Sequence, residues 1–511
     1  MLALVEHFPL LVVVLSLFSA FSIFLAGWVS RRSCVFISIG TLLIQFFMAI
    51  TILHRVLTRG PIRYRLGGWV PPWGIEYLMD AFNGYILVIL LFLATVCAVY
   101  SKRNIEHELA EKRVSFYTLF QLLITGLCGI TVTGDIFNMY VFIEITSLSA
   151  YALIASRGKI ALKASFTYLI LGSIGACFFL LGIGFLYAVT GSLNMEDLSR
   201  LLPPFYGSRA VRAAFVFFLV GLSIKMALFP LHTWLPDAHA FAPSEVSAML
   251  SGIIIEVSTY AFLRVAFSVF SVGFFNELPV FEIVSWVSAG AILFGSIWAM
   301  AQTNLKRMLA YSSVANMGYI MLAVGLATSA TRYPWAGLTP AAMHILNHAL
   351  MKGCLFLVAG AFIYRGNIWE IQNLQGWGRR MPYTSAAFVI AALSMIGIPP
   401  SAGFVSKLYI ILASLETKQF AFVGVLLLSS LLNLIYFWRV IETLYMKVAE
   451  GEHGHTMATP REEVPLSMLI PILILSSLCI IMGALWLTKI PIPILDAVNT
   501  MFRLVGGQSW K

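Results

Sequence analysis

Apolar runs of about 20 residues recur from one end of the chain to the other, and this feature limits the fold more than any other. A helix of that length matches the hydrocarbon thickness of a bilayer, and the first such run extends from Phe8 to Trp28. Only helices satisfy every backbone hydrogen bond in lipid without an open edge. The alternating ten-residue segments typical of a membrane β-barrel are missing. The sequence therefore predicts an all-α polytopic membrane protein.

Composition agrees with this class. Hydrophobic residues make up 60% of the 511 positions and charged residues 11%, whereas a soluble domain carries about 25% charged residues. The first apolar run has no basic segment or cleavage site, so we interpret it as a retained helix. The net charge of +10 is spread over many loops, which argues against nucleic-acid binding. Six scattered cysteines without CxxC spacing indicate buried thiols, so neither metal ligands nor disulfides are expected.

The periodicity predicts about 14 transmembrane helices. Their centres lie near residues 18, 45, 88, 124, 146, 175, 222, 256, 290, 318, 350, 395, 433 and 475. Basic residues gather in loops that follow odd-numbered helices: Arg31, Arg32, Lys102, Arg103, Lys112, Arg113, Arg157, Lys159, Lys163, Arg379 and Arg380. Basic loops stay in the cytoplasm, so we expect a multi-pass cell-membrane protein with both termini outside the cytoplasm. Four arginines after the second helix run against this trend: Arg55, Arg59, Arg63 and Arg65.

Two of the predicted helices contain proline breaks. Lys225 precedes Pro230 in the seventh helix, and Lys407 follows Pro399 and Pro400 in the twelfth. Broken helices at matching places in two halves indicate inverted repeats around a site near the membrane midplane. The expected division has an N-terminal three-helix unit, two five-helix repeats and a loop with the last helix: residues 1–112, 113–270, 278–447 and 448–511.

Ionisable residues inside the apolar runs are the main functional signal. Lys225 lies in the middle of the run 215–230, where a lysine costs about 3 kcal/mol on insertion scales. Six other residues are placed in the same way: Glu144, Glu256, His344, His348, Lys352 and Lys407. Such groups are retained when they face a bundle interior, find a partner or line an ion path. We therefore predict a proton or cation pathway.

Glu144 and Lys225 are candidates for an ion pair. Two unit charges 4 Å apart at an effective dielectric constant of 20 attract each other by about 4 kcal/mol. Such a pair either fixes two helices together or, if it opens, acts as a switch for the lysine proton. We favour the switch.

His344, His348 and Lys352 are spaced by four residues and therefore share one face of a helix. Histidine relays protons because it ionises near neutral pH, and simple packing is the alternative. Haem ligation is a weaker alternative, because the other intrahelical histidines, His232 and His239, lie in a proline-broken segment. Arg264 lies two turns beyond Glu256 in the same helix, which would let these two side chains pair.

Four motifs resemble the antiporter-like subunits shared by respiratory complex I, Mrp-type sodium/proton antiporters and energy-converting hydrogenases. They are Lys225-x4-Pro230-x-His232-x-Trp234-Leu-Pro236-Asp237-Ala-His239-x3-Pro243, Lys306-Arg-Met-Leu-Ala-Tyr311-Ser-Ser-x4-Gly318, His344-x2-Asn347-His348-x3-Lys352-Gly and Gly397-Ile-Pro399-Pro-x2-Gly403-Phe-x2-Lys407. The resemblance covers residues 75–445. It implies inverted repeats along a hydrophilic axis, with Glu144 and Lys225 as the input pair, His344 and His348 in the middle and Lys407 as the exit group. We include His232, His239, Glu256 and Lys352 in the expected pathway.

Two positions depart from the family pattern. Glu256 stands where the family commonly has lysine, and Asn304 stands where an aspartate is usual. The first exchange reverses the charge at the junction between the half-channels. Together with the chain length, it favours a Mrp D-like subunit of an archaeal membrane-bound hydrogenase or sulfane sulfur reductase.

The resemblance implies a subunit that moves protons, with or without coupling to Na⁺, in a redox-driven membrane complex. The expected partners are other membrane subunits and lipid. The chain itself is expected to hold no cofactor or metal, and the redox clusters would lie in partner subunits. The alternatives are a subunit of a stand-alone Mrp-type antiporter, a structural subunit with an inactive channel, a broken-helix solute transporter and a haem-based electron carrier.

Overall fold

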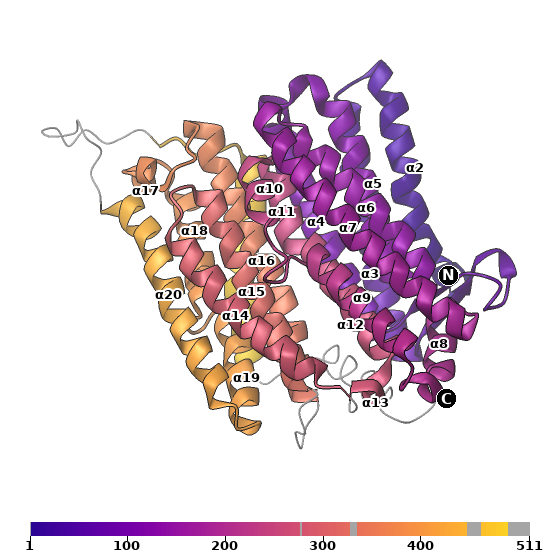
Figure 1. The fold of residues 1–511 in the computed structure, drawn as a ribbon. Coiled ribbons are helices and arrows are strands. Elements are labelled where there is room, and N and C mark those ends of the chain that lie inside the picture. Colours follow the sequence, from indigo (N-terminus) through magenta and orange to yellow (C-terminus); the bar gives the residue numbers. More distant parts are fainter. Residues whose placement is uncertain (1, 276–277, 328–334, 447–460, 489–511) are drawn as a thin grey trace, which may run out of the picture.

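The computed structural model describes residues 2–275, 278–327, 335–446 and 461–488. These residues form a predominantly helical bundle, with the first half of the chain on the right and the second half on the left in Figure 1. Twelve helical segments in the described part are long and apolar enough to cross a membrane. The prediction of a polytopic helical membrane protein is therefore confirmed at this level.

The first part of the chain builds the helices on the right of Figure 1. Their bounds are α1 Leu2–Val5, α2 Phe8–Val29, α3 Ser33–Arg59, α4 Ala81–Glu108, α5 Arg113–Val132, α6 Ile136–Ala155 and α7 Lys159–Thr190. The chain continues with α8 Met195–Leu201, α9 Arg209–Lys225, α10 Leu235–Phe241, α11 Ser244–Met249, α12 Ile255–Arg264 and α13 Ser271–Phe275. Two π-helical segments, η4 Leu250–Ile254 and η5 Val265–Val269, join α11, α12 and the turn before α13 into one long buried segment.

The second part supplies the remaining helices. They are α14 Val280–Met300, α15 Leu305–Ala327, α16 Trp335–Gly366, α17 Trp377–Arg380, α18 Pro382–Ile396, α19 Ala402–Glu416, α20 Phe420–Tyr445 and α21 Leu466–Leu487. Short 3₁₀ turns complete the described helical elements: η1 Leu66–Gly68, η2 Ala110–Lys112, η3 Pro203–Phe205 and η6 Ile371–Leu374.

A β-hairpin between α3 and α4 is a feature that the sequence did not predict. Its strands, β1 Ile62–Arg65 and β2 Glu76–Met79, pair antiparallel, with Ile62 opposite Met79. Arg63 on β1 forms an ion pair with Glu196 of α8, and its guanidinium lies 3.7 Å from Glu76. An ion pair thus connects the hairpin to the bundle. Arg63, one of the four arginines that run against the loop-charge trend, has two carboxylates nearby.

Both proline breaks appear as ends of helices. The chain leaves α9 at Lys225 and becomes helical again at α10, and it leaves α18 at Ile396 and resumes at α19. Gly397 adopts a φ of +93°, a conformation that suits glycine, directly after α18. A Cβ on Gly403 would lie 2.0 Å from the Ser394 carbonyl oxygen, so glycine permits the close contact between the two half-helices.

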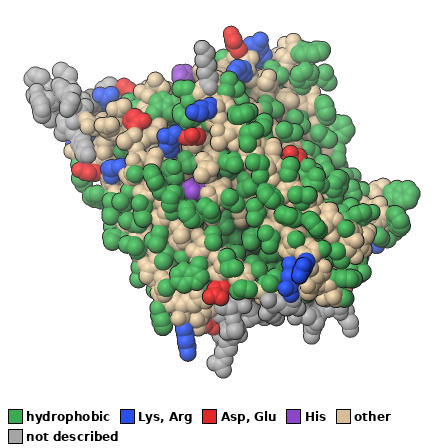
Figure 2. Space-filling model, in the orientation of Figure 1, with side chains coloured by type: hydrophobic (Ala, Val, Ile, Leu, Met, Phe, Trp, Pro, Cys, Tyr) green, Lys and Arg blue, Asp and Glu red, His purple; other side chains and the backbone are tan. Residues whose placement is uncertain are grey.

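The centre of the bundle is buried and its outside is apolar. The segment 244–269, α15 and residues 338–366 of α16 lie almost entirely inside the protein, whereas only 33% of the apolar stretch of α2 and of α20 is buried. On the face in Figure 2, charged side chains gather toward the upper and lower edges and hydrophobic ones cover much of the surface between them. This is the surface that a bilayer solvates. The ionisable groups described next therefore lie on the inner helices.

Candidate ion pathway

The first broken helix holds its lysine against α6. Lys225 Nζ at the end of α9 lies 3.5 Å from Glu144 Oε1 and donates a 2.7 Å hydrogen bond to Ser147 Oγ. Lys225 is buried, while the side chain of Glu144 is 29% exposed. The ion pair suggested by the sequence is therefore present, with its acidic member partly open to the outside of the bundle. Ser147, one turn from Glu144, is a partner that sequence reasoning missed.

Glu256 lies at the centre of the bundle and contacts α16. Its Oε1 is 2.5 Å from His348 Nδ1, and both side chains are almost completely buried. The residue sits at the start of α12, directly after the π-helical segment η4. π-Helical turns widen a helix locally and are frequent at functional sites. The acid at position 256 thus has a direct partner that can exchange a proton with it.

A row of hydrogen-bonding groups continues from His348 toward the second break. The rings of His348 and His344 are stacked with centroids 6.4 Å apart. His344 Nδ1 lies 2.9 Å from Ser406 Oγ, and its Nε2 lies 3.0 Å from Asn316 Oδ1. Ser406 precedes Lys407 in α19, so the row runs from Glu256 through the two histidines to the neighbour of Lys407.

The two remaining lysines bind backbone carbonyls. Lys352 Nζ donates to Leu309 O over 2.7 Å and also to Ser312 of α15. Lys407 Nζ donates to Met395 O over 2.7 Å and to Ile396 O over 3.3 Å, at the end of α18. Within the described residues, neither lysine has a carboxylate within 4 Å, which distinguishes both from Lys225.

Besides Lys352, two further predicted pathway residues, His232 and His239, are not joined to the row. The His232 ring packs against Phe229 and Phe294. His239 is stacked on Phe356, and neither of its ring nitrogens has a hydrogen-bond partner among the described residues. Among the residues that the structure describes, no direct hydrogen bond connects Lys225 with Glu256. The structure thus contains a separate ion pair and a central row, in which hydrogen bonds join Glu256 to His348 and His344 to Ser406 while the two histidine rings are stacked.

The expected pairing of Arg264 with Glu256 is replaced by another contact. Arg264 Nη2 lies 2.6 Å from Asp80 Oδ2, and both side chains are buried. Asp80 also caps the start of α4 by accepting from the amides of Phe82 and Asn83. Helical spacing indicated only that Arg264 and Glu256 share a helix face. The tertiary contact between α12 and the start of α4 brings Asp80 to Arg264 instead.

These elements together define a class. A bundle of membrane-spanning helices, with two helices broken beside buried lysines and a row of ionisable groups between them, has the architecture of an ion-translocating membrane subunit. Residues 133–433 match the family described as "NADH:quinone oxidoreductase/Mrp antiporter, TM". The chain belongs to this family, as the motifs suggested.

Related proteins extend the match to almost the whole chain. Over 488 residues the chain is 43% identical to the NADH-quinone oxidoreductase subunit N of Desulforudis audaxviator, covering 93% of this chain and 95% of that protein. It is 30% identical to the D subunit of the Na⁺/H⁺ antiporter of Bacillus subtilis over 441 residues, 86% of each chain.

Solved structures agree. A chain of the archaeal membrane-bound sulfane sulfur reductase superposes with a TM-score of 0.86 and 30% identity, covering 98% of this chain and 97% of that one. A chain of the Mrp complex from Dietzia sp. also gives 0.86, with 25% identity, covering 99% of this chain and all of that one. The protein is therefore an antiporter-like membrane subunit similar to those of complex I-type respiratory complexes and Mrp antiporters.

Proposed function

We propose that this chain carries protons across the cell membrane as one subunit of a redox-driven respiratory complex. The observation that carries the proposal is the buried row of Glu256, His348, His344 and Ser406, which ends beside Lys407. Each carboxyl or imidazole in this row can accept a proton on one side and release it on the other. The similarity to NADH-quinone oxidoreductase subunit N and to a sulfane sulfur reductase chain supports the proposal that the chain assembles with redox subunits.

In this proposal, the Glu144–Lys225 pair controls entry. At 3.5 Å the pair is short enough for an attraction of about 4 kcal/mol at an effective dielectric constant of 20. A membrane voltage supplies about 2.3 kcal/mol per charge per 100 mV. The two energies are comparable, so the pair can open and close during turnover. When it opens, Lys225 loses its carboxylate partner and gives up its proton more readily, which delivers the proton toward Glu256.

The proposal includes a membrane topology. The broken pairs α9–α10 and α18–α19 would each cross the membrane once and add two spans to the twelve continuous ones, giving fourteen. An even number places both termini on one side, which the loop charges put outside the cytoplasm. The two breaks would then be related by inverted five-helix repeats, residues 113–270 and 278–447.

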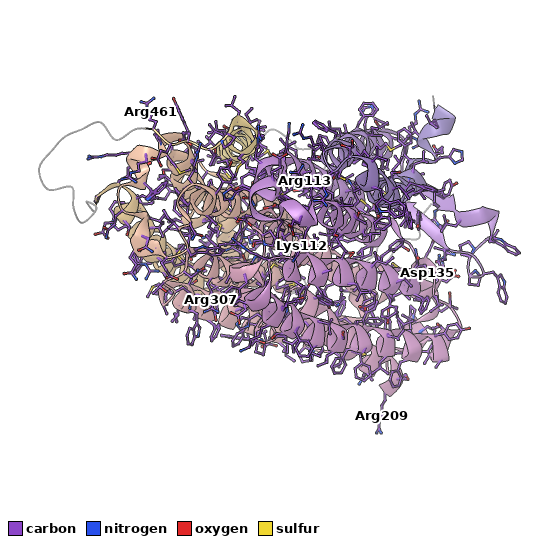
Figure 3. All side chains as sticks on the ribbon, turned by 90° about the horizontal axis from the view of Figure 1, so that it is seen from above. Lys112, Arg113, Asp135, Arg209, Arg307 and Arg461 are labelled. Carbon is purple, nitrogen blue, oxygen red and sulfur yellow. The ribbon has the colours of Figure 1, made fainter. Side chains whose placement is uncertain are left out.

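The direct test is Lys225→Ala in the assembled complex. We expect proton translocation in proteoliposomes to fall at least about tenfold, because the entry switch loses its cation. Arg209→Ala is the matched control, since Arg209 begins the same helix and projects away from the bundle in Figure 3. Undiminished translocation by Lys225→Ala at normal assembly would reject the role.

Two alternative functions make different predictions and can be tested separately. The 30% identity to the D subunit of an Na⁺/H⁺ antiporter favours a stand-alone antiporter as the second candidate. It predicts Na⁺ efflux driven by a proton gradient without any electron donor. A structural subunit with an inactive channel predicts that joint replacement of Glu256, His348 and Lys407 leaves translocation intact while assembly survives.

A further inference from the structure

The lysines at the two helix breaks have different surroundings. Lys225 at the first break faces the carboxylate of Glu144 and the hydroxyl of Ser147. Lys407 at the second break faces oxygens that carry no charge. Its nearest partners are Met395 O and Ile396 O, two of the last carbonyls of α18. In a continuous helix these two carbonyls would accept from the amides of residues 399 and 400, but both are prolines without an N–H, so the carbonyls can bind a cation.

Other helices complete the surroundings of the Lys407 ammonium. When the amide of Asn433 is oriented so that its oxygen and nitrogen both find partners, Oδ1 lies 3.1 Å from Lys407 Nζ. Its nitrogen then donates to Tyr436 Oη and Ser429 O. The ring of Tyr319 lies on another side, with its centroid 4.7 Å from Lys407 Nζ. Three neutral oxygens and an aromatic face thus surround one positive charge.

Such a set of ligands suits a small alkali cation as well as an ammonium group. Backbone carbonyls at the C-terminal end of a broken helix carry partial negative charge and are typical ligands of Na⁺ in broken-helix transporters. Carbonyl oxygens can also replace the water shell of a monovalent ion. The site is buried and Lys407 is tethered through a flexible side chain, so the ammonium group can leave without unfolding the backbone.

We propose that Met395 O, Ile396 O and Asn433 Oδ1 form a Na⁺ site, which Na⁺ and the Lys407 ammonium group occupy in turn. When Na⁺ enters, Lys407 releases one proton to water and withdraws as a neutral amine. The charge at the site remains +1. When Na⁺ leaves, Lys407 takes up a proton and returns. This exchange rests on the proposed ion-translocating function and would couple one Na⁺ to one H⁺.

Few other ionisable groups face the site. Tyr319 of α15, His344 of α16 and Tyr436 of α20 are the titratable neighbours, and α18 and α21 contain no charged residue. His344 reaches the site through Ser406, one residue from Lys407. Protonation of His344 would repel Na⁺ and the ammonium group alike. Lys407 is therefore the group whose proton is exchanged for the ion.

The test measures binding of radioactive sodium to the purified complex by equilibrium dialysis, with choline chloride keeping ionic strength constant. For the natural complex, we expect the half-saturating Na⁺ concentration to fall by about tenfold per unit rise in pH, because one proton leaves for each ion bound. Lys407→Met removes the competing ammonium group. We expect this variant to bind Na⁺ more tightly and without that pH dependence.

A second substitution in the Lys407→Met background tests the ligands themselves. Asn433→Leu removes one oxygen and should weaken Na⁺ binding by roughly tenfold, equivalent to about 1.4 kcal/mol. Asn373→Leu, at an exposed position in η6, is the matched control. Lys407→Leu replaces Lys407→Met if the latter fails to assemble.

Equal binding with and without Asn433→Leu, or no gain in Na⁺ binding on removal of Lys407, would overturn the proposal. These measurements need no turnover, so their failure is distinct from a failure of the translocation test on Lys225.

Discussion

Four of the buried lysines and acids in the bundle, Lys225, Lys352, Lys407 and Glu256, differ more in their partners than in their burial. Lys225 has a carboxylate, Lys352 and Lys407 have carbonyl oxygens, and Glu256 has an imidazole. A buried charge without a close opposite charge is costly. Carbonyl ligands offset only part of that cost, whereas Lys225 also has an opposite charge beside it. The sequence revealed that these residues lie inside the membrane but did not reveal this difference.

At the residue scale, Glu256→Gln tests the centre of the row. Glutamine keeps a hydrogen-bonding group beside His348 but cannot accept a proton. We expect proton translocation to fall at least about tenfold with normal assembly, measured with a pH-sensitive dye in proteoliposomes. Glu282→Gln on the exposed side of α14 is the control for loss of one carboxylate. Equal rates in the two variants would remove Glu256 from the pathway.

The buried Arg264–Asp80 pair gives a second prediction at this scale. Asp80→Asn leaves the Arg264 cation without its closest acid, and breaking a buried pair in this way costs about 3–5 kcal/mol. We expect a lower midpoint of thermal unfolding for the detergent-solubilised complex. Arg103→Ala disrupts the exposed Arg103–Glu106 pair, which is worth under about 1 kcal/mol. Comparable unfolding midpoints for the two variants would contradict a stabilising role of the Arg264–Asp80 pair.

At the element scale, the breaks in the helices were predictable and their geometry was not. Proline and glycine positions indicated where α9 and α18 end. The distances across the second break depend on how closely α18 and α19 approach, and Gly403 sets that approach. Sequence spacing also placed His344, His348 and Lys352 on one helix face. In the structure their contacts diverge: His344 contacts α19 and α15, His348 contacts α12, and Lys352 contacts α15.

Gly403→Ala tests the packing of the second break. The added methyl group would lie 2.0 Å from Ser394 O, a backbone atom that cannot move away cheaply. We expect α18 and α19 to separate, with less assembled complex recovered and a lower unfolding midpoint. Gly424→Ala in α20 is the control, because no atom lies within 4 Å of the new methyl group. The prediction fails if Gly403→Ala assembles and melts like the control.

At the scale of the whole molecule, the orientation in the membrane is the property to test. Helix α4 separates the hairpin tip at Trp69 from Lys112, so we expect these positions on opposite sides of the membrane. The loop charges predict that Lys112 lies in the cytoplasm. We expect a membrane-impermeant maleimide to label Trp69→Cys in intact cells and Lys112→Cys only after permeabilisation. The exposed Cys177 is first replaced by serine to remove background labelling. The reverse pattern would invert the topology.

The sequence by itself determined the class of the protein, because runs of about 20 apolar residues allow only membrane-spanning helices. It also pointed to ionisable groups inside apolar runs, of which Lys225, Glu256 and Lys407 are buried and Glu144 is partly exposed. Tertiary structure alone decided how these groups are partnered: Glu256 with His348, Arg264 with Asp80, and Lys407 with the carbonyls of α18. The reason is that local periodicity fixes the face on which a side chain lies. The partner across that face comes from a helix distant in the sequence.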